Sequence, residues 1–189
     1  MKKSLPIALA FVLFALIGNT ALAQTFDYPV KGKQGFALTE KTRGGLHITY
    51  NVGQVSLNAI NYRGEEMSEV SIKAIAIPND AGKPNLPADS RMMAIPQGAT
   101  ATLEVVSFDK EVIHNVNIAP ALRIQSENEE PDMNYVKDMA IYGKNAFYPA
   151  EPFTMGNSYI RSVDAVTVAI TPFQYNPVTK ELVVYTDIE

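Results

Sequence analysis

The sequence contains no cysteine, no tryptophan and only two histidines, His47 and His114. Without cysteine, the chain has no disulfide, no thiolate ligand for a metal and no cysteine nucleophile. Two histidines cannot make a three-histidine metal centre, and both lie among apolar neighbours, as half-buried residues of strands do. We therefore expect no metal, no cofactor and no enzyme activity from this chain by itself.

The chain also has little net charge. Lys and Arg number 16 and Asp and Glu number 20, which gives a formal net charge of -4. Such a mildly acidic chain has no basic footprint for nucleic acid and little attraction to an anionic membrane. Hydrophobic residues make up 47% of the 189 residues. This share excludes a disordered chain and suffices for the core of one ordinary domain.

The longest apolar run lies at the amino terminus and predicts a signal peptide. Two lysines precede the run Leu5–Ile17, and Ala21–Ala23 has the small-x-small pattern that signal peptidases cleave. The run is shorter than the ~20 residues of a membrane-spanning helix, so an uncleaved anchor is the weaker alternative. We expect the first 23 residues to be removed by cleavage between Ala23 and Gln24. The product is then periplasmic, on the outer-membrane surface or secreted, without stable membrane insertion.

The remaining residues show the alternation of apolar and polar residues that is typical of β-strands. Only the stretch from Asp132 to Gly143 is compatible with a short helix. Sequential strands without helices between them favour antiparallel pairing. The sequence thus predicts an all-β fold, either an antiparallel β-sandwich or a partly closed barrel, with one short helix. The expected strands include Leu46–Val52, Val55–Ile60, Val70–Ile77, Ala101–Phe108, Glu111–Ile118, Val163–Thr171 and Leu182–Ile188.

Turn residues indicate how these strands connect. Gly53 and Gln54 lie between the first two strands and suggest a hairpin, and the turn Asn176–Thr179 precedes the last strand. A change of phase within Ala101–Phe108 suggests a β-bulge. We expect a loose amino-terminal arm over residues 24–45, followed by a single domain over residues 46–189.

Two groups of side chains could carry a function but have simpler explanations. An acidic cluster between Glu127 and Asp132 lacks the glycine and the ligand spacing of a calcium-binding EF-hand, so a solvated loop explains it better. Aromatic residues in the last third could form a platform for sugars, although core packing explains them more simply. These aromatic residues are Phe147, Tyr148, Phe153, Tyr159, Phe173 and Tyr175.

Four short segments resemble one family. They are the proline-stiffened stretch Gly82–Arg91, the segment Ile118–Pro120, the segment Phe147–Glu151 and the stretch Phe173–Lys180. In this order and with similar spacing, they resemble the N-terminal propeptide of the gingipains, exported cysteine endopeptidases of peptidase family C25 in Bacteroidetes. The resemblance extends from about Lys83 to Ile188.

The resemblance implies a β-sandwich-like prodomain rather than an enzyme. Such a domain is expected to lie on the active-site face of a C25 catalytic domain, to keep the zymogen latent and to assist its folding. It inhibits by laying a loop across the substrate cleft. Inhibition of this kind needs shape complementarity and an anchoring side chain, not catalytic groups. Family propeptides continue into a processing junction, so we expect this domain to be truncated at Glu189.

The resemblance places the protease-binding loop after Pro120. The expected contact residues are Arg123, Ile124, Gln125, Ser126, Glu127 and Asn128. Family members that inhibit Arg- or Lys-specific peptidases have a basic residue where this chain has Glu127. An acidic pocket would repel this carboxylate. The loop could instead present Arg123, the partner could have another specificity, inhibition could be lost, or Glu127 could be one charge of a solvated loop.

A second class of function stays open at this stage. The aromatic residues of the last third could make the chain a binding module of an exported surface protein that recognises glycan or peptide. Binding of sugars through Tyr148, Tyr159 or Tyr175 would support this alternative, whereas tight binding to a C25 peptidase would support the prodomain.

Overall fold

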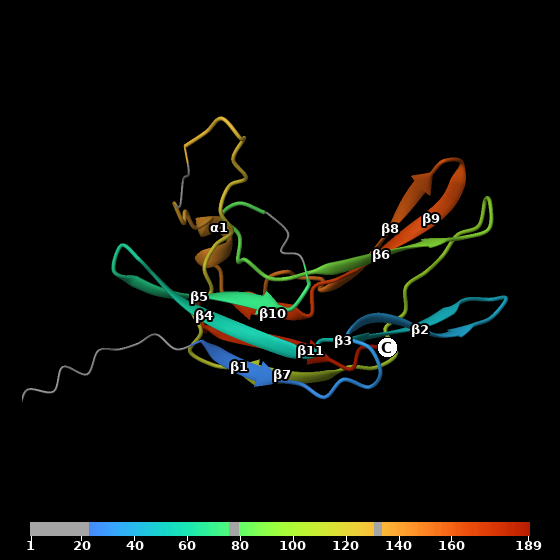
Figure 1. The fold of residues 1–189 in the computed structure, drawn as a ribbon, viewed down its shortest axis with the longest axis horizontal. Coiled ribbons are helices and arrows are strands. Elements are labelled where there is room, and N and C mark those ends of the chain that lie inside the picture. Colours follow the sequence, from blue (N-terminus) through green and yellow to red (C-terminus); the bar gives the residue numbers. More distant parts are fainter. Residues whose placement is uncertain (1–22, 76–79, 131–133) are drawn as a thin grey trace, which may run out of the picture.

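The computed structural model describes residues 23–75, 80–130 and 134–189. The predicted signal peptide lies outside the described residues except for its last residue, Ala23. The described residues form eleven strands and one short helix (Figure 1). Their bounds are β1 Gln24–Asp27, β2 Gly35–Lys41, β3 Leu46–Asn51, β4 Gln54–Tyr62, β5 Glu65–Ile72, β6 Asp89–Ala94, β7 Asp109–Ile113, α1 Met139–Tyr142, β8 Phe153–Ile160, β9 Val163–Ile170, β10 Phe173–Asn176 and β11 Glu181–Thr186.

The strands form four small antiparallel sheets. Their orders are β1-β4-β5, β10-β11-β7, β2-β3 and β6-β9-β8. The prediction of an all-β, antiparallel fold with one short helix is confirmed. Within the described residues the sheets stay open, so the architecture is the sandwich rather than the barrel. No helix among these residues is long and apolar enough to cross a bilayer.

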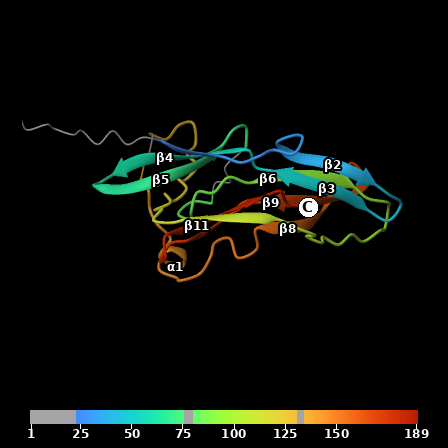
Figure 2. The ribbon, with the colours of Figure 1, turned by 90° about the horizontal axis from the view of Figure 1, so that it is seen from below.

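The core lies between two layers of sheet. Seen from below, the β4–β5 hairpin and the β2–β3 hairpin lie on one side, and β11, β9 and β8 lie on the other (Figure 2). Alternate residues of β4, such as Val55 and Leu57, are buried, as expected for a strand with one face on the core. Leu182 and its neighbours in the central strand β11 are buried on both faces. One hydrophobic cluster thus joins the two layers.

Two turns follow from their residues. Arg63 and Gly64 both have positive φ angles, of 53° and 82°, which gives the tight turn of the β4–β5 hairpin. The predicted turn after β10 is present, because the Asn176 side-chain oxygen accepts hydrogen bonds from the backbone N–H groups of Val178 and Thr179.

The predicted hairpin at Gly53 is wrong. Strand β3 pairs with β2, whereas β4 pairs with β1 and β5. Gly53, with φ of +72°, turns the chain from one sheet into the next, and its carbonyl accepts a hydrogen bond from Tyr28 N–H at 3.1 Å. The apolar residues on either side of Gly53 therefore serve two different sheets.

The predicted bulged strand over Ala101–Phe108 is also wrong, because this stretch is irregular. Its apolar residues Val105, Val106 and Phe108 are largely exposed, and Val106 N–H donates to the carbonyl of Glu189 rather than to a neighbouring strand. Strand β7 begins only at Asp109 and ends at Ile113.

The bounds of β5 also differ from those of the predicted strand. Strand β5 starts at Glu65, well before the expected strand Val70–Ile77, and ends at Ile72, because the chain turns at Ala74, which has a φ of 61°. The far end of that expected strand, residues 76–77, lies outside the described residues.

The arm expected over residues 24–45 contains two paired strands, β1 and β2. The interpretation of both histidines as half-buried is wrong. His47 is exposed on β3, and His114 follows β7 with its Nδ1 atom 3.4 Å from Glu181 Oε1.

Candidate functional site

The stretch expected to bind a protease projects from the body of the domain. Ile118, Ala119 and Pro120 are buried, whereas from residue 123 to residue 130 nearly every side chain is exposed. We call residues 122–130 the projecting loop. In Figure 1 it is the gold loop above α1, at one end of the molecule. We call the flanking residues 117–121 and 134–138 its two stems.

The first stem is held on both sides by backbone hydrogen bonds. Ser68 of β5 donates to the carbonyl of Asn117 at 2.7 Å and accepts from Ala119 N–H at 2.9 Å. On the other side, Asn85 N–H donates to the carbonyl of Ala119 at 3.0 Å, and Ala121 N–H donates to the carbonyl of Lys83 at 2.8 Å. The proline-stiffened stretch of the resemblance thus supports the start of the loop.

The second stem rests on the β4–β5 hairpin. The Tyr62 hydroxyl hydrogen-bonds the side chain of Asn134, and the Tyr62 and Tyr135 rings meet edge to face at 5.3 Å. The Tyr135 hydroxyl donates to Glu69 Oε1 at 2.9 Å. Burial and this contact raise the pKa of Tyr135 to about 12, so the hydroxyl stays protonated and remains a donor. These contacts fix the direction in which the second stem leaves the body.

Both stems meet at one glycine. Gly82 N–H donates to the carbonyl of Ala121, and the carbonyl of Gly82 accepts from Asp138 N–H, each at 2.9 Å. Gly82 has a φ of +82°, and a Cβ there would come within 3.2 Å of the Val136 carbonyl oxygen. Glycine is therefore the residue that fits this position.

An ion pair strengthens the second stem. Lys137 Nζ pairs with Glu65 Oε1, which also accepts a hydrogen bond from Asn117 Nδ2 at 3.0 Å. The hydrogen bonds from Lys137 and then Asn117 hold the pKa of Glu65 below its ordinary value of 4.5. The Glu65 carboxylate thus links the two stems to the hairpin turn.

This lowered pKa predicts an acid-sensitive stem. The stabilisation is complete above pH 4.5, the ordinary pKa of the carboxyl, and is lost as the pH falls through the lowered pKa of the folded state. We expect Glu65→Gln to reduce the pH dependence of the free energy of unfolding in this acid range, measured by urea unfolding between about pH 6 and pH 3. Glu66→Gln is the matched control, because Glu66 meets Asn117 through its backbone carbonyl. Identical pH profiles for Glu65→Gln and the parent would contradict the assignment.

The tip of the projecting loop is a tight turn. Glu129 N–H donates to the carbonyl of Ser126 at 3.0 Å, so Glu127 and Asn128 occupy the corner. Arg123 Nη2 lies 2.6 Å from Glu129 Oε2 and ties the two sides of the loop together. The hydrogen bond from Arg123 lowers the pKa of Glu129. Arg123 is therefore engaged within the loop, whereas Glu127 is exposed without a partner among the described residues.

The aromatic residues of the last third do not form a platform. Phe173 and Tyr175 are fully buried, and the Tyr175 hydroxyl donates to the carbonyl of Val116 at 3.0 Å. Phe153 packs edge to face against Tyr185 inside the domain. Core packing therefore explains most of these side chains, and Tyr159 is the most exposed of them.

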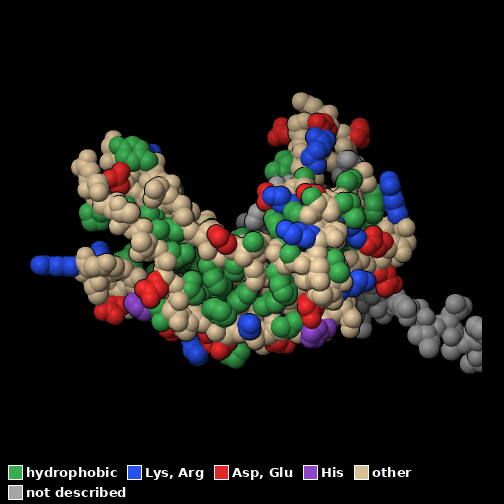
Figure 3. Space-filling view, turned by 180° about the vertical axis from the view of Figure 1, so that it is seen from behind, with side chains coloured by type: hydrophobic (Ala, Val, Ile, Leu, Met, Phe, Trp, Pro, Cys, Tyr) green, Lys and Arg blue, Asp and Glu red, His purple; other side chains and the backbone are tan. Residues whose placement is uncertain are grey.

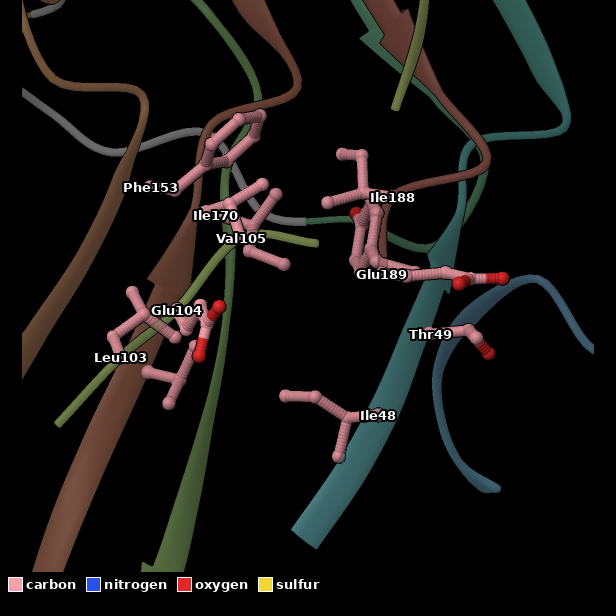
Figure 4. Close-up of a pocket in the computed structure, with 11 residues that line it drawn as sticks. Ile48, Thr49, Leu103, Glu104, Val105, Phe153, Ile170, Ile188 and Glu189 are labelled. Carbon is pink, nitrogen blue, oxygen red and sulfur yellow. The ribbon is translucent and has the colours of Figure 1, made fainter. Parts of the chain in front are cut away.

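One small pocket is a seam between sheets. It lies between β3, β9 and the carboxyl-terminal residues, with Ile48, Leu103 and Ile170 among its apolar walls (Figure 4). Its volume of about 30 Å³ is far below the ~300–1,000 Å³ of sites that bind organic ligands. Over the part of the chain that the structure describes, no cluster of His, Asp or Glu could hold a metal ion.

The six residues expected to contact a protease, Arg123 to Asn128, thus share one projecting loop. Sequence reasoning missed the side chains that support it, above all Tyr62, Glu65 and Tyr135. Of the residues that support the loop, Gly82 was the one that the sequence indicated, since it is the first residue of a stretch that carries the resemblance.

Several curated proteins are similar in sequence to this chain over long stretches. The chain is 38% identical to gingipain R2 of Porphyromonas gingivalis W83 over 192 residues, which cover 100% of the chain and 26% of the relative. It is 38% identical to gingipain R1 of P. gingivalis over 112 residues (58% of the chain, 11% of the relative) and 26% identical to Lys-gingipain W83 over 149 residues (75% and 8%). The chain therefore spans about a quarter or less of the length of these relatives.

Solved structures and a family model agree with these relatives. A structure that addresses zymogenic latency of gingipain K matches with a TM-score of 0.73 at 22% identity, over 88% of this chain and 95% of that chain, which is evidence of the fold alone. The complex of P. gingivalis RgpB pro- and mature domains matches with a TM-score of 0.74 at 27% identity, over 81% of each chain. The family model Propeptide_C25 matches residues 33–189. The chain therefore belongs to the C25 propeptide family.

Proposed function

We propose that this chain is the N-terminal prodomain of a secreted, gingipain-like cysteine endopeptidase. Its partner is the catalytic domain of a C25 peptidase, which it keeps latent and whose folding it assists. The observation that carries the proposal is the projecting loop, which is exposed along its length yet held at both stems through Gly82. The RgpB complex of pro- and mature domains supports the choice of partner.

The loop acts by occupying the substrate cleft of the catalytic domain. Because Arg123 is bound to Glu129, the charged side chain offered at the corner of the loop is Glu127. A carboxylate is accepted by a basic or polar pocket and rejected by an acidic one. The cognate peptidase therefore has a specificity different from a preference for Arg or Lys.

The test is inhibition by the isolated domain. We expect residues 24–189 to inhibit a mature C25 peptidase that lacks its own prodomain, and to leave an unrelated cysteine peptidase of the papain type fully active. The measurement is the inhibition constant from progress curves with a small fluorogenic substrate. Absence of inhibition of the cognate catalytic domain at micromolar concentrations would refute the proposal.

Export follows the same proposal. Family membership is consistent with an exported chain, and we propose cleavage after Ala23 by a signal peptidase, which places the mature protein in the periplasm, on the outer surface or outside the cell. Amino-terminal sequencing of exported material is expected to begin at Gln24. Exported protein that retains Met1 would show that the segment is an anchor instead.

A further inference from the structure

A second projection stands on the same side of the molecule as the projecting loop. It is the hairpin of β8 and β9, the orange strands opposite the gold loop in Figure 1. Ile160 pairs with Val163, and the two residues between them, Arg161 and Ser162, have φ angles of 46° and 68°. We call residues 159–164 the hairpin tip. Two-residue turns of this kind usually contain Asn or Gly, so Arg and Ser in left-handed conformations are unusual.

The hairpin tip carries apolar side chains where polar ones are expected. Tyr159, Ile160 and Val163 are 68%, 46% and 47% exposed. In the view from behind, green side chains gather at the end of this projection, whereas charged side chains gather on the other projection (Figure 3). Ile160 and Val163 are a cross-strand pair and share one face of the tip. Apolar surface left in water costs about 25 cal/mol per Å², which points to a partner that covers this pair.

The hairpin tip is braced rather than loose. Gly98 N–H donates to Asp164 Oδ2 at 2.7 Å, and Ile95 N–H donates to the carbonyl of Asp164 at 2.9 Å. A hydroxyl pair between Ser158 and Thr167, 2.6 Å apart, links the two strands below the tip. A rigid, apolar projection loses little freedom when it docks, which is the property of a binding anchor.

The loop alone offers too little surface for tight inhibition. Stable protein–protein interfaces bury about 800 Å² per partner and involve about 20–30 residues a side, whereas the projecting loop has the nine residues 122–130. Additional contact has to come from the same side of the prodomain. There, the space-filling view shows a hollow between the two projections, and apolar side chains gather on the face of the molecule below it (Figure 3).

We infer that the hairpin tip is a second docking point, and that the cross-strand pair of Ile160 and Val163 inserts into an apolar depression on the same catalytic domain, beside the cleft that receives the projecting loop. The inference rests on the proposed function. A single globular body that touches the end of the projecting loop and spans the hollow meets the hairpin tip. The loop then supplies the charged, specific contact and the hairpin supplies apolar anchoring.

The test is an inhibition assay with Ile160→Asp in residues 24–189. Because Ile160 is exposed, the variant is expected to fold normally, which circular dichroism and the midpoint of thermal unfolding check. We expect its inhibition constant to rise at least tenfold. We also expect slower amide hydrogen exchange at residues 158–165 of the parent domain in the complex. The matched control is Leu38→Asp, which changes an exposed leucine of β2 on a hairpin that does not share the direction of the two projections (Figure 1).

The outcomes separate the inference from the proposed function. If the parent domain inhibits and Ile160→Asp inhibits equally well, the hairpin tip is not a docking point, although the prodomain function stands. If Ile160→Asp turns a dimer of the isolated domain into a monomer without changing inhibition, the tip is a self-association surface and the inference is wrong. If the parent domain does not inhibit at all, the proposed function fails, and the inference fails with it.

Discussion

Glu127→Ala is expected to raise the inhibition constant of the prodomain about thirtyfold. Glu127 lies at the corner of the turn closed by Ser126 and Glu129, without a partner among the described residues, so its side chain is the charged one that is free to enter a pocket. Removal of a central anchor typically costs about 2 kcal/mol or more, which corresponds to that factor in affinity. The measurement is the inhibition constant against the mature catalytic domain.

Two further variants define the sign of the charge that the pocket prefers. Glu127→Lys is expected to inhibit even more weakly than Glu127→Ala, because a pocket that accepts a carboxylate repels an ammonium group. Arg123→Ala removes only the exposed ion pair with Glu129, which solvent and salt screen, and changes inhibition less than Glu127→Ala. Stronger inhibition by Glu127→Lys than by the parent would show that the pocket is acidic, and would overturn the assignment of Glu127.

Phe173→Ala is expected to cost about 3–5 kcal/mol of the free energy of unfolding, because it leaves a large cavity in the core. Phe173 is fully buried on β10, directly opposite the equally buried Val184 of β11. The free energy of unfolding of a domain of this size is about 5–15 kcal/mol in total, so that of the variant is much smaller. Urea unfolding followed by circular dichroism measures the change.

The exposed Val178, in the turn that follows β10, provides the control for this core variant. Val178→Ala is expected to change stability by about 0.5 kcal/mol at most. If Phe173→Ala is already unfolded in water, Phe173→Leu leaves a smaller cavity and keeps a measurable transition. A loss below about 1 kcal/mol for Phe173→Ala would mean that the site collapses around the missing ring.

The strands that could be predicted are those with one face on the core. Val55, Leu57 and Val70 alternate with polar residues because one face of each strand is exposed to solvent and the other packs on the core. The period of two is therefore visible in the sequence. The strands β1 and β2 were missed because most of their side chains are exposed, which removes that period. Conversely, Val105 and Val106 belong to a sequence pattern that is typical of a strand, although both are exposed in an irregular segment.

The loop could be located from the sequence, but its support could not. The position after Pro120 followed from a resemblance, and the exposed residues Arg123 to Asn128 lie together because they are consecutive. By contrast, Tyr62 meets Asn134 across 72 positions of the chain, and Tyr135 meets Glu69 across 66. Such contacts depend on how the sheets are placed, and local periodicity contains no information about that placement.

The meeting of both stems at Gly82 has a thermodynamic consequence for binding. Joining the ends of a loop of about 15 residues costs roughly 3 kcal/mol of chain entropy. Gly82 joins them when the domain folds, through its N–H to Ala121 and its carbonyl to Asp138. That entropy is therefore lost during folding rather than at the moment of association, and a preorganised loop binds more tightly for this reason. A linear peptide with the sequence of the loop lacks this closure. It is therefore expected to bind the catalytic domain more weakly than the same segment does within the folded prodomain.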